Sequence, residues 1–144
     1  MIAPDLEQRI RDGFARWNRG DHSFDPEWTD PDVEIHAAAA EFAGTTYRGM
    51  EGIVRWVADM SEAFDEWQLD LHELEEFAPG RVLGVGTVHL RGRGSGVAVD
   101  LPCAWLFDHA DGVLTRFQPF PNRVEEARAI AAGGSAGPEA GLGS

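Results

Sequence analysis

The sequence predicts an α+β fold in which helices pack on one face of a curved, mostly antiparallel β-sheet. Apolar residues recur at helical spacing in two stretches of the first half, 4–20 and 50–64. In the second half they alternate at strand spacing, and turns divide the alternating segments. When the helices come first and the hairpin-connected strands last, the helices are expected to form one layer and the sheet another, which is the α+β class. Its 144 residues suffice for one domain with a sizeable core.

The first helix is predicted to begin at Pro4 and to end at Gly20, a natural C-terminal cap. Its apolar side chains recur three or four residues apart and share one face: Leu6, Ile10, Phe14 and Trp17. The following segment, 22–32, contains two prolines and is predicted to form turns or a short helix. Phe24 and Trp28 are its expected contacts with the core.

A strand predicted over 33–38 is followed by the second helix. Alternation along the strand places Glu34 and His36 on one face, opposite Val33 and Ile35. The helix then presents a second apolar stripe: Met50, Ile53, Trp56, Val57, Met60 and Phe64.

Four further strands are predicted in the second half, with the ranges 67–72, 81–93, 97–108 and 113–120. The last two are joined by an Asp-Gly hairpin turn at 110–112. Gly84 and Gly86 leave room on one face of their strand, where a bulge, a bend or a ligand is expected.

Residues 1–132 are predicted to form the single domain, which ends in a short helix within 125–132. Gly, Ser, Ala and Pro dominate residues 133–144, a composition typical of a disordered tail. The small-residue segment Ala39–Thr46 is either a mobile lid or a fixed wall, and both alternatives stay open.

Charge excludes two classes of partner. The chain has 12 basic and 25 acidic residues, a net charge of −13, so it repels nucleic acid and anionic membranes. Cys103 is the only cysteine, which excludes an intrachain disulfide and fits a reducing compartment. The first residues, MIAPDLEQ, do not have the pattern of a signal peptide, and no apolar run approaches about 20 residues. We therefore expect a soluble, cytoplasmic protein.

Five short runs resemble one known superfamily. They are NRGD at 18–21, DVEIH at 32–36, YRGMEGI at 47–53, HADG at 109–112 and RF at 116–117. With these runs, residues 5–130 resemble the SnoaL-like branch of the nuclear transport factor 2-like superfamily, which includes ketosteroid isomerase and polyketide cyclases. The resemblance implies a cone-shaped sheet wrapped around the N-terminal helices, the cystatin-like α+β barrel. It also implies a homodimer that forms through the outer face of the sheet.

The same resemblance argues against ketosteroid isomerase activity. The general base of that enzyme corresponds to His36 or its neighbour. Its buried acid corresponds to Cys103, and the tyrosine of its first helix falls near Gly13. The oxyanion-holding pair of a tyrosine and a neutral carboxylic acid is therefore missing.

Glu34, His36 and Tyr47 are the candidate catalytic residues. Histidine has an intrinsic pKa of about 6.5, so an imidazole at position 36 is suited to act as a general base at neutral pH. Glu34 would orient it, and Tyr47 would donate a hydrogen bond to a developing oxyanion. The structural alternative is a partly buried histidine whose nitrogens bond to loop backbone, and the third alternative is a histidine that contacts a ligand without taking part in chemistry. Burial of His36 away from any cavity would exclude the catalytic hypothesis.

An apolar pocket is expected between the helices and the concave face of the sheet. The candidate ligand-binding residues are Trp17, Trp56, Val88, Leu101, Cys103, Trp105 and Phe117. Such walls suit a small, flat, apolar ligand such as a polyketide, steroid or terpenoid. Apolar neighbours make Cys103 an inert wall residue rather than a nucleophile.

We expect neither a metal nor another cofactor. A site of Glu34, His36 and His89 is disfavoured because His89 lies on the polar face of its strand. The glycine-rich run 92–96 lies between two strands and lacks the lysine of a phosphate-binding loop, so we interpret it as a hairpin loop.

Three functional hypotheses follow. The first is an isomerase, cyclase or dehydratase that acts by proton transfer on an apolar carbonyl compound. The second is a non-catalytic binding or accessory protein that uses the same pocket. The third is a dimerisation module, in which the aromatic side chains themselves fill the pocket.

Overall fold

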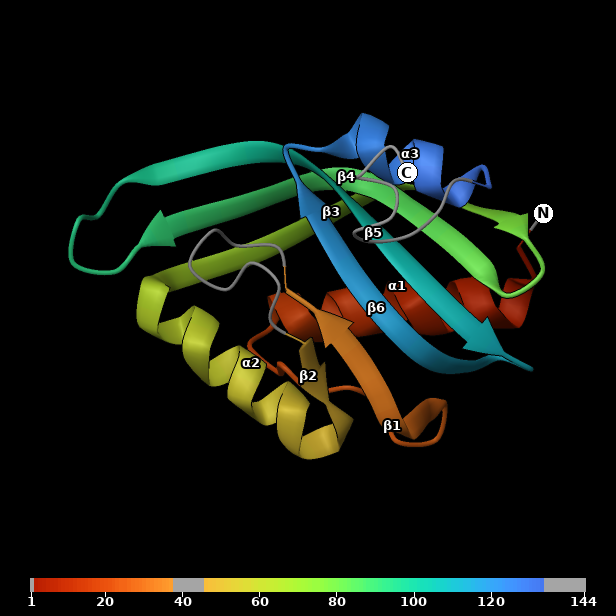
Figure 1. Ribbon diagram of the computed structural model, residues 1–144. Coiled ribbons are helices and arrows are strands. Elements are labelled where there is room, and N and C mark those ends of the chain that lie inside the picture. Colours follow the sequence, from red (N-terminus) through yellow and green to blue (C-terminus); the bar gives the residue numbers. More distant parts are fainter. Residues whose placement is uncertain (1, 38–45, 134–144) are drawn as a thin grey trace.

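The structure, a computed structural model, describes residues 2–37 and 46–133 (Figure 1). In chain order its elements are α1 (Pro4–Asn18), β1 (Thr29–His36), β2 (Thr46–Arg48), α2 (Gly49–Ala63), β3 (Phe64–Ala78), β4 (Arg81–Gly92), β5 (Ala98–Ala110), β6 (Val113–Pro121) and α3 (Val124–Ala131). The predicted lid or wall, apart from its last residue, and the predicted tail beyond residue 133 lie outside the described residues.

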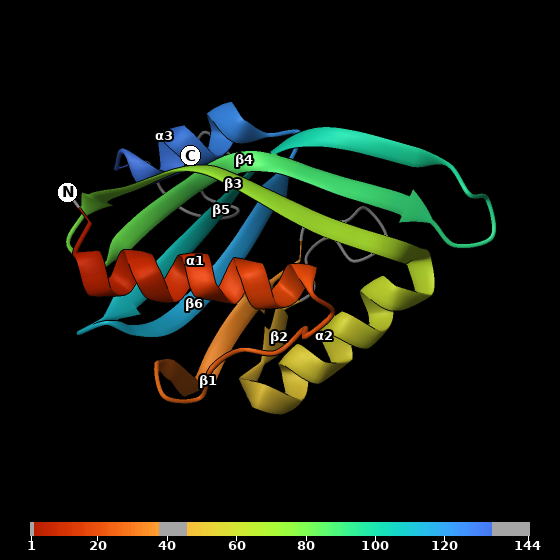
Figure 2. The same cartoon turned by 180° about the vertical axis from the view of Figure 1, so that it is seen from behind.

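One curved sheet of six strands in the order β2-β1-β6-β5-β4-β3 organises the fold. β1 and β6 are parallel, and the other neighbours are antiparallel. Helices α1 and α2 lie on the concave side, and α3 covers part of the opposite side (Figures 1 and 2). The predicted α+β class and curved, mostly antiparallel sheet are confirmed. The sheet is not closed, because β2 and β3 are at its two ends.

Three strands differ from the prediction. β1 begins at Thr29 and ends at His36 instead of spanning 33–38, so the end of the segment predicted as turns or a short helix is strand, where Thr29 pairs with Leu114 of β6. β2, with only three residues, was not predicted, because three residues are too few to show an alternating pattern. It exists because it pairs with β1, where Ile35 lies opposite Tyr47. β3 spans 15 residues, Phe64–Ala78, instead of the predicted 67–72. Its acidic half does not alternate clearly, and pairing with β4 along its whole length holds it extended.

The hydrophobic core has two parts on opposite sides of the sheet. The larger part fills the space between the concave face and helices α1 and α2. The smaller part packs α3 against four side chains of β4, β5 and β6: Leu83, Ala104, Leu106 and Phe120. β5 belongs to both parts, and its residues 103–107 are each at most 4% exposed. Burial does not extend to the start of the strand, because Val99, near the hairpin tip, is 40% exposed.

Gly86 allows β3 to approach β4 closely. A Cβ atom built on Gly86 would lie 1.8 Å from the backbone oxygen of Asp70, so no larger residue fits. The register of β3 shifts between Leu71 and Glu73, next to this approach. The expected bulge is therefore present, and the strand backbone of β3 occupies the room that the glycine leaves.

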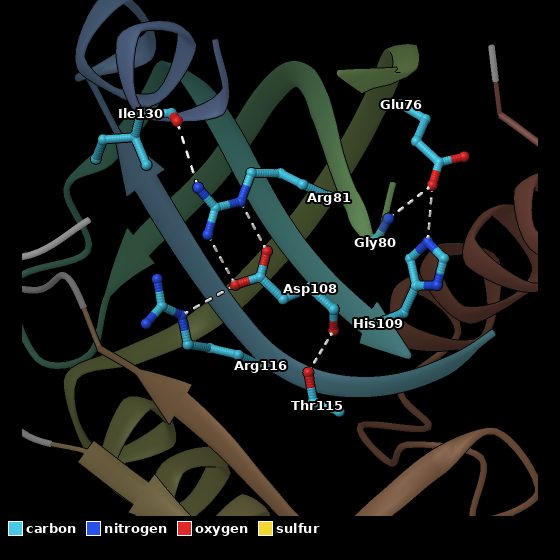
Figure 3. Close-up of polar contacts among 8 residues, drawn as sticks. All are labelled: Glu76, Gly80, Arg81, Asp108, His109, Thr115, Arg116 and Ile130. Atoms are coloured by element: carbon cyan, nitrogen blue, oxygen red, sulfur yellow. Dashed lines mark hydrogen bonds and ion pairs between the residues drawn. The ribbon is translucent and has the colours of Figure 1, made fainter. Parts of the chain in front are cut away.

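A row of alternating charges crosses the outer face of the sheet. Glu34 of β1 lies opposite Arg48 of β2 and Arg116 of β6, and Arg116 lies opposite Asp108 of β5, which in turn lies opposite Arg81 of β4. Arg81 donates to both oxygens of Asp108, at 2.9 and 3.2 Å, and Arg116 Nε lies 3.4 Å from the same carboxylate (Figure 3). Arg81 also donates to the backbone oxygen of Ile130, at 3.4 Å, which ties α3 to the sheet.

We predict that Asp108→Asn destabilises the fold by about 2 kcal/mol, because two arginines lose the charge that neutralises them in a partly buried place. Chemical denaturation measures the free energy of unfolding. The matched control is Asp65→Asn, which removes the exposed partner of Arg91. This control should leave the denaturation midpoint nearly unchanged, and equal effects of the two variants would contradict the prediction.

Candidate ligand pocket

A cavity of about 320 Å³ lies between α1, α2 and the concave face of the sheet. The loop between α1 and β1 completes its wall. Its lining residues are Ile10, Gly13, Phe14, Arg16, Trp17, Ser23, Phe24, Asp25, Trp28, Trp56, Met60, Phe64, Trp67, Leu69, Val88, Leu90, Leu101, Cys103, Trp105, Phe107, Leu114, Phe117, Pro119 and Pro121. Most of these side chains are apolar, and the volume falls in the range of small-molecule sites.

Aromatic rings that pack on one another form much of the wall. Trp67 meets Trp17 and Trp56 edge to face, with ring centroids 4.8 and 5.2 Å apart. Phe14 of α1 meets Trp105 of β5 in the same way at 5.0 Å. Such pairs are favourable beyond the area they bury, and each ring restricts its neighbour. The helices are thereby attached to the sheet through rigid groups, and the space between them stays open.

All seven predicted ligand-binding residues line this cavity: Trp17, Trp56, Val88, Leu101, Cys103, Trp105 and Phe117. That they bind a ligand stays a prediction. Sequence reasoning missed the polar part of the wall, which consists of Arg16, Ser23 and Asp25. Two of these belong to the irregular segment 22–28, where no periodic pattern could assign a side chain to a face.

Cys103 lies in the floor of the cavity as a neutral thiol. Cys103 is 1% exposed, and this burial raises the pKa of its thiol to about 12. At physiological pH the nucleophilic thiolate is therefore scarcely populated.

His22, a residue that sequence reasoning did not single out, packs beside the aromatic wall. Its ring lies 4.7 Å from that of Trp17 and 5.8 Å from that of Trp67, measured between centroids. Burial lowers the pKa of His22 below its ordinary value. The imidazole is therefore mostly neutral at physiological pH, which suits its contact with apolar rings.

Glu34 and His36 lie on the outer face of the sheet. Val33 and Ile35, which alternate with them, are fully buried in the inner core. Glu34 Oε1 lies 3.0 Å from His36 Nε2, and Glu34 Oε2 lies 3.0 Å from a terminal nitrogen of Arg48. The hydrogen bond from His36, aided by the charges of Arg48 and Arg116, lowers the pKa of the Glu34 carboxyl. Neither predicted catalytic side chain lines the cavity.

Tyr47 is buried in the core and also lies outside the cavity wall. Its hydroxyl donates to Asp59 Oδ2 of α2 at 2.6 Å. Burial, with the nearby carboxylate, raises the pKa of Tyr47 to about 12. Gly52 of α2 approaches the backbone of Tyr47 so closely that a Cβ on it would lie 2.9 Å away. Tyr47 therefore attaches the start of α2 to β2, and the geometry gives it no contact with a pocket ligand.

Comparison with known proteins places the chain in a family. The model of the SnoaL-like domain family matches residues 10–117. This match covers well over half of the chain, and the protein therefore belongs to the SnoaL-like domain family. A search of curated proteins finds no match.

Solved structures with the same fold span nearly the whole chain. An NTF2-like protein of unknown function from Burkholderia pseudomallei has a TM-score of 0.72 and 18% identity, covering 89% of this chain and 98% of that one. TerC, co-crystallised with polyporic acid, has a TM-score of 0.71 and 22% identity, covering 87% and 97%. An NTF2-like protein from Burkholderia thailandensis has a TM-score of 0.69 and 26% identity, covering 87% and 96%.

Within residues 2–37 and 46–133, no group of three or more His, Cys, Asp or Glu side chains is placed to hold a metal ion. In that same part of the chain, no helix has the length and apolar character needed to cross a membrane.

We predict that Cys103 resists alkylation by iodoacetamide at pH 8 in the folded protein, because its thiol is buried and neutral. The same reagent should modify it fully in denaturant, which serves as the control. Mass spectrometry counts the adducts over time. Rapid modification of the folded protein would show that the thiol is accessible and ionised.

Proposed function

We propose that the protein binds a small, flat, apolar molecule in the cavity between its helices and the concave face of the sheet. The observation that carries the proposal is an open cavity of about 320 Å³ with a mostly aromatic and aliphatic wall. Ligands that bury a planar apolar surface, such as polyketides, steroids or terpenoids, match such walls.

The open cavity also argues against the third sequence hypothesis. A pure dimerisation module would require the aromatic side chains to fill the pocket themselves. These side chains pack on one another around the space and leave it hollow. The homodimer that the family resemblance implies stays a prediction, and so does the cytoplasmic location.

Binding without catalysis agrees best with the geometry. By the resemblance, the oxyanion-holding tyrosine of ketosteroid isomerase falls near Gly13 and its buried acid at Cys103, and both residues line the cavity. One has no side chain and the other is a neutral thiol, so neither replaces the missing groups. His36, the predicted base, lies on the opposite face of the sheet. TerC, a structural neighbour, was crystallised with a small molecule, polyporic acid, and this supports a binding role for the same fold.

We predict that Gly13→Leu weakens binding of the neutral fluorescent probe N-phenyl-1-naphthylamine at least about tenfold. Gly13 lines the cavity from α1, and a Cβ built on it has no neighbour within 4 Å, so a leucine side chain extends into open space. The helix should be stabilised by up to about 1 kcal/mol, because glycine is a poor helix former. Fluorescence titration measures the affinity, and denaturation measures the stability.

Gly13→Ala is the matched control, because it has the same helical benefit but adds only one methyl group. It should bind the probe within about twofold of the wild type. The proposal fails if the wild type does not bind the probe, or if Gly13→Leu binds it as well as Gly13→Ala does.

We predict that His36→Gln and Glu34→Gln leave the affinity for the same probe unchanged within about twofold, because both side chains point away from the cavity. Loss of the charged contact to Arg48 should lower the thermal midpoint of Glu34→Gln slightly. A marked loss of affinity in either variant would place these residues back in the binding site.

A further inference from the structure

Three side chains form a charge cluster on the outer face of β3, β4 and β5, and we call it the His89 clamp. His89 of β4 lies between Asp70 of β3 and Asp100 of β5. Its Nδ1 is 2.7 Å from Asp100 Oδ1, and its Nε2 is 2.6 Å from Asp70 Oδ2. The clamp therefore connects three neighbouring strands through one imidazole ring.

The two distances require a protonated ring. A neutral imidazole donates from only one nitrogen and presents a lone pair at the other, whereas imidazolium donates from both. Carboxylate oxygens only accept, so both contacts are hydrogen bonds only when His89 carries its second proton. After deprotonation, one carboxylate faces a lone pair, and the two carboxylates lose the positive charge between them.

The clamp lies directly behind the wall of the cavity. In a strand, successive side chains point to opposite faces, so the neighbours of the clamp residues point inward. Four of these neighbours line the cavity: Leu69, Val88, Leu90 and Leu101. Any change in the spacing of β3, β4 and β5 at the clamp therefore moves the apolar surface that a ligand would contact.

We propose that protonation of His89 strengthens ligand binding, because the closed clamp holds the three strands of the cavity wall together. This inference rests on the proposed function. It assigns to the pocket a dependence on pH, with tighter binding in the protonated state and easier release as the pH rises.

The groups that face His89 determine whether the affinity rises or falls with pH. Hydrogen bonds from the ring to Asp100 and then Asp70 raise the pKa of His89 above its ordinary value. A raised pKa means that the stabilisation is complete below about 6.5, the ordinary value, and is lost as pH rises through the higher folded value. Gln68, opposite His89 on β3, is neutral. On β4 itself, Arg91 is paired with Asp65 at 2.8 Å and Glu66 at 3.7 Å.

The groups in the cavity wall do not produce the same pH dependence. The thiol of Cys103 in the wall has a pKa of about 12, so it stays protonated from pH 6 to pH 9. His22, beside the wall, has a lowered pKa, so it loses its proton at a lower pH than His89, whose pKa is raised. Because the probe is itself uncharged, a change in its affinity with pH reflects a change in the cavity wall.

The test measures the affinity for N-phenyl-1-naphthylamine from pH 6 to pH 9 at low ionic strength, since salt screens exposed charges. In the wild type we expect the affinity to fall by about two- to fivefold over this range, as for exposed ion pairs. In His89→Gln and Asp100→Asn this dependence should disappear. His72→Gln is the control, because it removes an exposed histidine of β3 outside the clamp and should retain the wild-type pH dependence.

NMR titration of the histidine rings supplies a second measurement that needs no ligand. His89 should titrate above 6.5 in the wild type and return toward that value in Asp100→Asn. An affinity that is independent of pH, or that changes equally in His89→Gln, would overturn the inference and leave the proposed function intact. A His89 pKa at or below 6.5 would also overturn it. Failure of the wild type to bind the probe at every pH would overturn both.

Discussion

The burial of β5 on both faces is the constraint on which the rest of the structure depends. Its inner side chains, including Cys103 and Trp105, form the floor of the cavity, while Ala104 and Leu106 support α3 on the other side. A strand between two apolar layers must be central in the sheet, and β5 has β4 and β6 as its neighbours. At its end, Asp108 joins those neighbours through Arg81 and Arg116.

The cavity exists because its walls are built from large rings that pack on one another rather than on the sheet alone. Interiors are normally packed as densely as organic crystals, so an open space of this size needs rigid surroundings. Trp17 and Trp56 hold the two helices against Trp67 of β3, and this contact limits how far the helices can approach the sheet. A preformed apolar space is available to a ligand without the cost of opening it.

Charges are segregated to the outer face of the sheet, where strand pairing orders them. The alternating row from Arg48 to Arg81 and the His89 clamp both lie on the side opposite the cavity. The two faces of one strand thus perform different tasks, since apolar residues line the pocket while their neighbours connect the strands. The predicted base, His36, belongs to the outer set, and this position supports our proposal that the cavity binds a ligand without catalysis.

The sequence by itself determined the α+β class, the two amphipathic helices, the separation of each strand into two faces and seven residues of the cavity wall, because these depend on local periodicity. Only the tertiary structure decided what depends on contacts between distant segments. It paired Thr46–Arg48 with β1, extended β3 along β4 and placed Ser23 and Asp25 in the cavity wall. Alternation separated His36 from Ile35 correctly, but it could not tell which face borders the cavity. That depends on where α1 and α2 pack, which is a property of the assembled core.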